Sequence, residues 1–428
     1  MTRTKSLLGI LFLGILTIVP MSLFASGQQQ SGTGGEKSVT IQYWAQMDQP
    51  RVAIYTESMK AFEAKNPGIK VELQQEVGDN TQVEQKLSAQ LAAGNAPQVV
   101  HIDTQYIKDM ADAGRILKLN DFPGAQDLSK AFYSSVMDPL MDKGGIYGYP
   151  IRANTIELIV NNSMLKAAGI DPANPAETMA QLRADAIKLT QKDSSGNITV
   201  YGFGPSFNKD PHWTVHAFTP YLWSEGGSYY DPKTMTAGWA GKAGIDTLNY
   251  FRDLIDVQKV SPAYDIDNGF QSGKMAMWIN GEWQIGPTKK NFPNLDFSFH
   301  TIPVAQAGET PILPLGGRAV TIPKGATHQA EAWKLIQWVE SRDEQLRYTH
   351  AQVGLSPRQD ILSDSWFNDH PNFKLVAQDM AHVKAKYAPS LLQMDVILYN
   401  AIQSTIINGT PADQALKSAA EQYNKLIQ

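Results

Sequence analysis

Residues 39–73, VTIQYWAQMDQPRVAIYTESMKAFEAKNPGIKVEL, set the pattern from which the fold can be predicted. Apolar and polar residues alternate from Val39 to Trp44, which predicts a strand with two different faces that ends at Trp44. Apolar side chains then recur at helical spacing up to Asn66-Pro67-Gly68, which predicts a helix that stops there. A second strand is expected from Ile69 to Leu73.

The same pattern then repeats along the chain. Apolar spacing predicts a helix over residues 83–91, a turn at 94–97 and a buried strand over 99–103 that ends at Asp103. Strands that alternate with helices form a parallel sheet, and ligands of such sheets bind outside the carboxyl ends of the strands. Trp44 and Asp103 fall at two of these ends, so both are candidate site residues.

Beyond this region a second α/β unit is expected, which begins with a strand at 156–160. Three segments suit crossings between two lobes: 147–151, 302–321 and 354–358. The predicted fold class is α/β, with two lobes, each a mainly parallel sheet flanked by helices, and several hinge crossings. Lobe 1 is predicted to hold residues 38–149 and about 303–353, and lobe 2 residues 150–302 and about 354–428. A single core stops growing at roughly 250 to 300 residues, which also favours two domains in a chain of 428 residues.

The amino terminus has the pattern of a secretory signal. Arg3 and Lys5 precede an apolar run from Leu7 to Val19, and small residues follow at 25–27. We expect a signal peptide at 1–27, cleavage after Gly27, and a flexible leader at 28–37. The sequence contains no cysteine, which excludes a lipid-bearing cysteine, disulfides and thiol chemistry, so we expect a soluble periplasmic protein of an organism with an outer membrane.

The charge balance bears on the possible partners. The chain has 37 Lys and Arg against 42 Asp and Glu, a net charge of −5 with no basic stripe. Nucleic acid is therefore not an expected partner, because binding to its phosphates needs concentrated positive charge. No feature suggests an oligomer, and a monomer is expected.

Several short motifs, in a fixed order, resemble the family 1 extracellular solute-binding proteins, the sugar-binding components of ABC importers that include the maltose binder. The resemblance covers nearly the whole chain after the signal. It rests on the 39–69 strand and helix, Gly94-Asn95-Ala96-Pro97, Gly148-Tyr149-Pro150, the stretch 158–169, Gly273-Lys274-Met275-Ala276-Met277, Gly281 with Trp283, Leu315-Gly316-Gly317 and the 330–339 helix. The family usually has Tyr-Asn where this chain has Asn161-Asn162.

The resemblance implies two lobes that close over a carbohydrate, mono- or oligosaccharide, and transient docking on a membrane permease. Such a site needs aromatic faces for sugar rings and planar polar groups for hydroxyls. The candidate ligand-binding residues are Trp44, Asp48, Asp103, Arg152, Asn154, Trp223, Trp278, Glu282, Trp283, Gly316, Gly317 and Arg318. For Asp48 and Asp103 helix capping is the alternative, with equal weight for Asp103, and any tryptophan can instead belong to the core. Arg152 and Arg318 can bind hydroxyls or pair with a carboxylate across the hinge.

No metal site, cofactor or catalytic residue is predicted. His212 and His216 have the i, i+4 spacing of metal ligands, but no third ligand lies nearby, and a structural or surface role is favoured. Hydrolase motifs such as Gly-x-Ser-x-Gly and His-Glu-x-x-His are absent from the sequence.

Three alternatives stay open at this point. The same fold can bind a polyamine, a glycerophosphodiester, an anion or a peptide. An exported glycoside hydrolase would use two carboxylates, for which Glu225 and Glu282 are available. A periplasmic chaperone or adhesin would need no small ligand.

Overall fold

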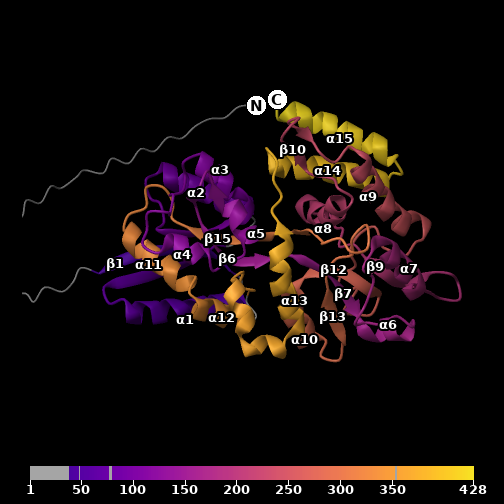
Figure 1. The fold of residues 1–428 in the computed structure, drawn as a ribbon, viewed down its shortest axis with the longest axis horizontal. Helices are drawn as coiled ribbons and strands as arrows, with labels where there is room; N and C mark the ends of the chain where they lie inside the picture. Colours follow the sequence, from indigo (N-terminus) through magenta and orange to yellow (C-terminus); the bar gives the residue numbers. More distant parts are fainter. Residues whose placement is uncertain (1–37, 48, 77–79, 352–353) are drawn as a thin grey trace, which may run out of the picture. The chain divides into compact units, whose positions relative to one another are not determined.

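The computed structural model describes residues 38–47, 49–76, 80–351 and 354–428 (Figure 1). The predicted signal peptide and leader, at 1–37, and the candidate residue Asp48 lie outside the described residues. Within the described ranges, no helix is both long enough and apolar enough to cross a membrane.

The first sheet is built around the strands predicted from residues 39–103. Its five strands lie in the order β2 (Ile69–Glu76), β1 (Val39–Gln46), β3 (Val99–Asp103), β15 (Gly316–Thr321) and β6 (Tyr149–Asn154). Strand β1 pairs in parallel with β2 and β3, whereas β15 is antiparallel to both β3 and β6. The core beside this sheet includes Tyr43, Phe62, Ile102 and Ile336, all almost fully buried. The βαβαβ unit is therefore confirmed, with strand ends within three residues of the prediction.

The second sheet is mixed. Its strands lie in the order β13 (Phe297–His300), β7 (Ile156–Asn161), β12 (Met275–Gly281), β9 (Ile198–Gly204) and β8 (Gln191–Lys192). Only the β12–β9 pair is parallel, and β7 is antiparallel to both of its neighbours. The prediction that this sheet is mainly parallel is wrong. The long connections in this part of the chain bring most of its strands beside an antiparallel neighbour. The α/β fold class itself is confirmed.

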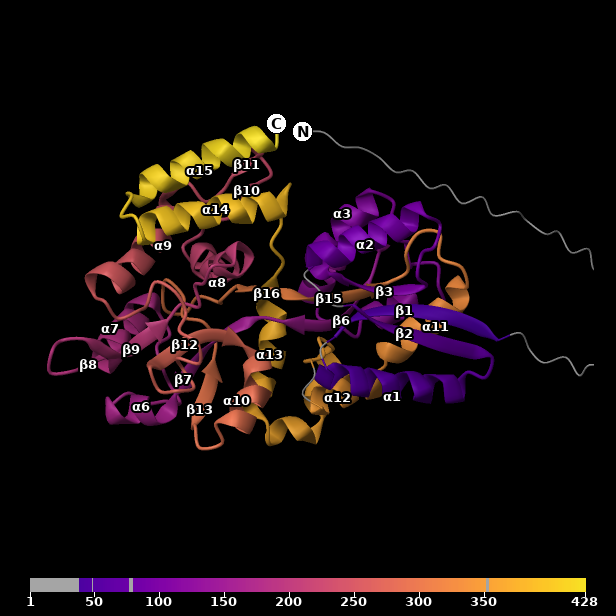
Figure 2. The same cartoon turned by 180° about the vertical axis from the view of Figure 1, so that it is seen from behind.

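Helices cover both sheets (Figures 1 and 2). With the first sheet are α1 (Gln49–Lys65), α2 (Asn80–Ala92), α3 (Ile107–Asp112), α11 (Gln329–Val339) and α12 (Arg342–His350). With the second are α6 (Asn162–Ala167), α7 (Met179–Leu189), α8 (Pro211–Ser224), α9 (Lys242–Arg252), α10 (Ile285–Asn291) and α13 (Pro371–Asp379). Helices α14 (Leu391–Ile406) and α15 (Ala412–Leu426) lie side by side next to α8 and α9.

Shorter elements fill the connections. They are α4 (Ala125–Ser129), α5 (Ser134–Met137) and the two-stranded pairs β4 (Met141–Asp142) with β5 (Gly145–Ile146), β10 (Tyr230–Asp231) with β11 (Thr236–Ala237), and β14 (Leu313–Pro314) with β16 (Val383–Lys384). The last pair joins segments that are about seventy residues apart in the chain, and the backbone N–H of Leu315, just after β14, donates to the Lys384 carbonyl oxygen at 2.8 Å.

The first crossing between the sheets lies later than predicted. Strand β6 contains Tyr149 and Pro150 and pairs with β15 of the first sheet, so the chain changes sheets at Thr155, between β6 and β7. The Thr155 hydroxyl donates to the carbonyl oxygen of Pro314, 3.0 Å away, which ties the first crossing to the second. The predicted boundary at 149/150 therefore falls inside the edge strand of the first sheet.

Candidate functional site

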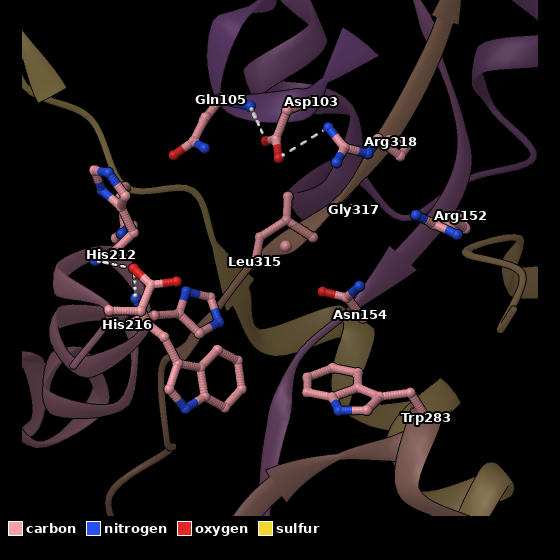
Figure 3. A pocket seen from close by; sticks show the side chains of 14 residues that line it. Asp103, Gln105, Arg152, Asn154, His212, His216, Trp283, Leu315, Gly317 and Arg318 are labelled. Carbon is pink, nitrogen blue, oxygen red and sulfur yellow. Dashed lines mark hydrogen bonds and ion pairs between the residues drawn. The ribbon is translucent and has the colours of Figure 1, made fainter. Parts of the chain in front are cut away.

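A cavity of about 340 Å³ lies where segments from the two sheets meet (Figure 3). The residues that line it are Asp103, Gln105, Arg152, Asn154, Asp210, His212, Trp213, His216, Trp283, Leu315, Gly316, Gly317, Arg318 and Lys386. They come from β3, β6 and β15 on one side and from α8 and the turn after β12 on the other. The cavity therefore lies at the carboxyl end of β3, as the rule for open α/β sheets requires.

Three charged residues lie at paired positions on three neighbouring strands of the first sheet. Arg318 of β15 is the register partner of Asp103 on β3 and of Arg152 on β6. Side chains at directly paired positions project to the same face of a sheet. The Arg318 guanidinium donates from Nη1 to Oδ2 of Asp103 at 3.3 Å, and Oδ1 of Asp103 accepts from the Gln105 backbone N–H at 3.2 Å. Asp103 therefore caps the short helical turn after β3, and it also lines the cavity.

Two glycines form the floor beside these charges. Gly317 has φ of 140°, which favours glycine, and a β-carbon there would clash with the Arg152 carbonyl oxygen. A β-carbon on Gly316 would clash with Oδ1 of Asn154. The absence of both side chains lets the backbone of β15 face the cavity and leaves the Asn154 amide room beside it.

The opposite wall is aromatic. Asp210 caps α8 by accepting from the backbone N–H groups of His212 and Trp213, at 2.9 and 3.4 Å, and Pro211 takes the first helical position. This start places Trp213 and His216 one turn apart, with their rings stacked at 5.7 Å between centroids and 24° between planes. The indole of Trp283, which follows β12, completes the wall and faces Asn154 and Gly317 in Figure 3.

A buried ion pair supports the far end of the cavity. Nζ of Lys386 lies 2.9 Å from Oδ2 of Asp395 on α14, and both side chains are almost fully buried. Nδ1 of His212 lies 3.0 Å from the same carboxylate oxygen. The pair fixes a segment that follows β16 against α8 and α14, so it holds the Lys386 ammonium group at the cavity surface.

Burial shifts the pKa values of several groups around the cavity. Burial, with the nearby Lys386 ammonium group, lowers the pKa of His216 to about 3, so its ring is neutral at physiological pH. Burial, together with Arg51 and Arg318, lowers the pKa of Arg152 to about 10, which still leaves it charged. Burial raises the pKa of Glu282 to about 8 despite the neighbouring Arg152 and Arg51, so its carboxyl is mostly protonated at pH 7.

The structure brings seven of the candidate residues together around this cavity. These are Asp103, Arg152, Asn154, Trp283, Gly316, Gly317 and Arg318. Four others lie outside its lining. Glu282 is buried behind Trp283, and Trp44 lies under the Lys86 ammonium group, 4.3 Å from the ring centroid.

The other two tryptophans pack into the second lobe. Trp223 is buried against Tyr229, 6.1 Å away between ring centroids, with the Lys384 ammonium group over its face. Trp278 is buried in β12 and donates from Nε1 to the Asp265 carboxylate at 3.2 and 3.3 Å. Trp278 lines an adjacent cavity of about 420 Å³, which also includes Trp213 and Trp283.

Sequence reasoning missed part of the lining. Gln105, Asp210, Trp213, Leu315 and Lys386 were not predicted, and His212 and His216 were expected to be structural or on the surface. The Asp210-Pro211 start of α8 is a signal that could have placed Trp213 and His216 on one helical face. Among the described residues no group of three potential ligands could hold a metal ion, so the histidine spacing does not build a metal centre.

Two sheets with several passages between them, and a polar and aromatic cavity where they meet, define a two-lobed solute-binding protein. The match to known sequences specifies the family: the model of the bacterial extracellular solute-binding proteins matches residues 48–346. The chain belongs to this family.

Relatives and solved structures agree with that placement. A putative binding protein of Brucella abortus is 25% identical over 93% of this chain and 94% of its own length. A maltotriose-binding protein of Pyrococcus abyssi is 22% identical over 93% of this chain and 83% of its own length. The structure is also similar to the cyclic α-maltosyl-1,6-maltose binding protein of Arthrobacter globiformis, with a TM-score of 0.79, 20% identity, and coverage of 91% and 99% of the two chains.

Proposed function

We propose that this chain captures a carbohydrate in the cavity between its lobes and delivers it to the membrane permease of an ABC importer. The observation that carries the proposal is the composition of the cavity. An aromatic wall of Trp213 and Trp283 faces Asp103, Asn154 and the exposed backbone of β15. Aromatic faces suit the C–H faces of sugar rings, and planar polar groups suit the hydroxyls.

Relatives that bind sugars support the same ligand class. The Pyrococcus abyssi protein is named for maltotriose, and the Arthrobacter globiformis structure for a cyclic maltosyl-maltose. We therefore assign contacts with the sugar to Asp103, Arg152, Asn154, Trp283, Gly316, Gly317 and Arg318, together with Trp213.

The proposed mechanism is lobe closure. A ligand that contacts groups of both lobes favours the closed state by its differential affinity, and the closed state is what a permease would recognise. Lobe 1 would hold the first sheet and lobe 2 the second, with passages at Thr155, at Leu315 and near Leu355. The protein would act as a monomer in the periplasm after removal of residues 1–27, with no catalysis and no cofactor.

Thermal unfolding of the purified protein against a panel of solutes tests the proposal. The panel holds mono- and oligosaccharides of glucose, mannose and arabinose, with spermidine, phosphate, glycerophosphocholine and a tripeptide as non-sugars. Binding to the folded state alone adds about 2.7 kcal/mol at a hundredfold excess over Kd, which gives a readily measured rise in Tm.

Each outcome decides between the alternatives. Stabilisation by one sugar series, with the sugar recovered intact by chromatography, supports a carbohydrate-binding protein. Stabilisation by a non-sugar alone, or cleavage of the sugar, contradicts it.

A further inference from the structure

On the first-sheet side of the cavity, two arginines, Arg318 and Arg152, lie beside one aspartate, Asp103. Like charges at directly paired positions of neighbouring strands destabilise a sheet, and Arg318 and Arg152 are such a pair. Asp103 pairs with Arg318 from the other side. Across the neighbouring strands β3, β15 and β6 the charged groups are therefore a carboxylate, a guanidinium and a second guanidinium. Arg152 is the arginine that is farther from Asp103.

Arg152 has no counter-ion among the residues that the structure describes. Among the described residues, no carboxylate oxygen lies within ion-pair distance of its guanidinium, and its Nε is buried without a hydrogen-bond partner there. Removal of a guanidinium from water without a partner is costly, because all five of its N–H groups are donors. Burial and the positive charges of Arg51 and Arg318 lower the pKa of Arg152, which shows the same imbalance.

The carboxyl groups close to the cavity do not correct this imbalance. Glu282 is mostly protonated at pH 7, since burial raises its pKa to about 8. The Asp395 carboxylate already holds Lys386 and His212, and Asp210 holds the first backbone N–H groups of α8. The Asn154 side chain beside Arg152 is an amide without charge, and it lines the same cavity.

We propose that the carbohydrate carries an anionic group, a carboxylate or a phosphate, which Arg152 binds beside Arg318. This inference rests on the proposed function and specifies its substrate class. A guanidinium fork binds a carboxylate or phosphate through two parallel hydrogen bonds. The anion would supply a negative charge beside Arg152, while the indoles of Trp213 and Trp283 hold the ring of the sugar.

Calorimetric titration with matched pairs of ligands tests this inference. The pairs are glucose with glucuronate, galactose with galacturonate, glucose with glucose 6-phosphate, and digalactose with digalacturonate. We expect the acidic member of one pair to bind about tenfold more tightly or better, because hydrogen bonds to a charged group are stronger than those to a neutral hydroxyl. The uronate and phosphate arms distinguish the two sources of the anion.

Variants then assign the effect to Arg152. Nε of Arg152 has no hydrogen-bond partner among the described residues, and Arg152→Gln should weaken binding of the acidic ligand about tenfold more than binding of its neutral partner. Arg152→Lys keeps the charge but not the two parallel N–H donors, so its affinity for the acidic ligand should lie between those of the wild type and Arg152→Gln. Arg342→Gln, at a half-buried arginine of α12 outside the cavity lining, is the matched control.

The results separate this inference from the proposed function. The inference of an anionic ligand is overturned if both members of every pair bind with equal affinity, or if Arg152→Gln lowers the affinity for both members equally. Either result leaves the proposal of carbohydrate binding intact. If no carbohydrate binds and only glycerophosphocholine or phosphate does, the proposed function itself fails.

Discussion

The indoles of Trp213 and Trp283 meet edge to face, with ring centroids 5.7 Å apart and planes 71° apart. One lies in the first turn of α8 and the other follows β12, so the wall they form joins two segments that are seventy residues apart. Such edge-to-face pairs stabilise each other beyond the effect of burial alone. Each indole therefore holds its neighbour at the cavity surface.

We expect Trp283→Ala to weaken ligand binding by about 2 kcal/mol, roughly thirtyfold, because a large aromatic anchor is lost from the centre of the site. Trp213→Ala should also weaken it, and the double variant should lose less than the sum, since the two rings contact each other. Titration calorimetry with the best ligand of the panel measures these losses. Trp366→Ala, outside the cavity lining, is the control; equal losses in all three single variants would contradict a specific wall.

A second prediction concerns the buried Lys386–Asp395 pair. Asp395→Asn should lower the free energy of unfolding by about 3–5 kcal/mol, because it leaves the almost fully buried ammonium group without its counter-ion. The double variant Lys386→Met, Asp395→Leu should recover much of this loss. Urea unfolding of the two variants and the wild type measures the difference. A double variant no more stable than Asp395→Asn would show that the ion pair is not the source of the loss.

The first half of the fold could be predicted because its signals are local. Strand alternation, helical spacing and Pro-Gly breaks placed β1, α1, β2, α2 and β3 to within a few residues. Strand β6 was taken for a crossing because Pro150 lies inside it. A proline is tolerated there since β6 is an edge strand that pairs with β15 alone in its sheet.

The site could be predicted only where a residue ends a strand or lies at a crossing. Asp103, Arg152 and Arg318 meet this condition, whereas Trp213 and His216 lie in a helix where core residues have the same spacing. Lys386 is brought to the cavity by the β14–β16 pairing and by Asp395, contacts between distant segments that leave no local pattern. Trp44 was expected to end β1, but the strand continues to Gln46 and the Trp44 ring packs beneath the Lys86 ammonium group.

A third prediction tests the backbone of the cavity floor. Gly317→Ala should destabilise the protein by about 1–3 kcal/mol, because its φ of 140° is unfavourable for alanine and the new methyl group would meet the Arg152 carbonyl oxygen. Gly354→Ala is a matched control, since its β-carbon would lie at ordinary contact distance, 3.6 Å, from Cβ of the same Arg152. Thermal unfolding compares the two, and equal Tm values would argue against strain at Gly317.

The last prediction concerns the pH dependence of stability. Glu340 is fully buried, and burial raises its pKa to about 8, although the Arg358 charge acts in the opposite direction. Oε2 of Glu340 accepts a hydrogen bond from Nε2 of Gln345 at 3.0 Å, and Oε1 has no hydrogen-bond partner among the described residues. The pKa of Glu282 is also raised to about 8. Between the unfolded value near 4.5 and the folded value, the folded state binds more protons than the unfolded state, so stability falls as pH rises.

We therefore expect the free energy of unfolding to decrease from pH 7 to 8, a range above the ordinary histidine pKa of 6.5, where the buried His101 and His216 add little opposing slope. Each carboxyl contributes at most about 1.4 kcal/mol per pH unit. Glu340→Gln, which stays neutral and can keep the contact with Gln345, should flatten this slope and be more stable than the wild type at pH 8. Urea unfolding across the range provides the measurement, with Glu421→Gln on the exposed face of α15 as control. Parallel curves for the wild type and Glu340→Gln would show that Glu340 does not titrate in this range.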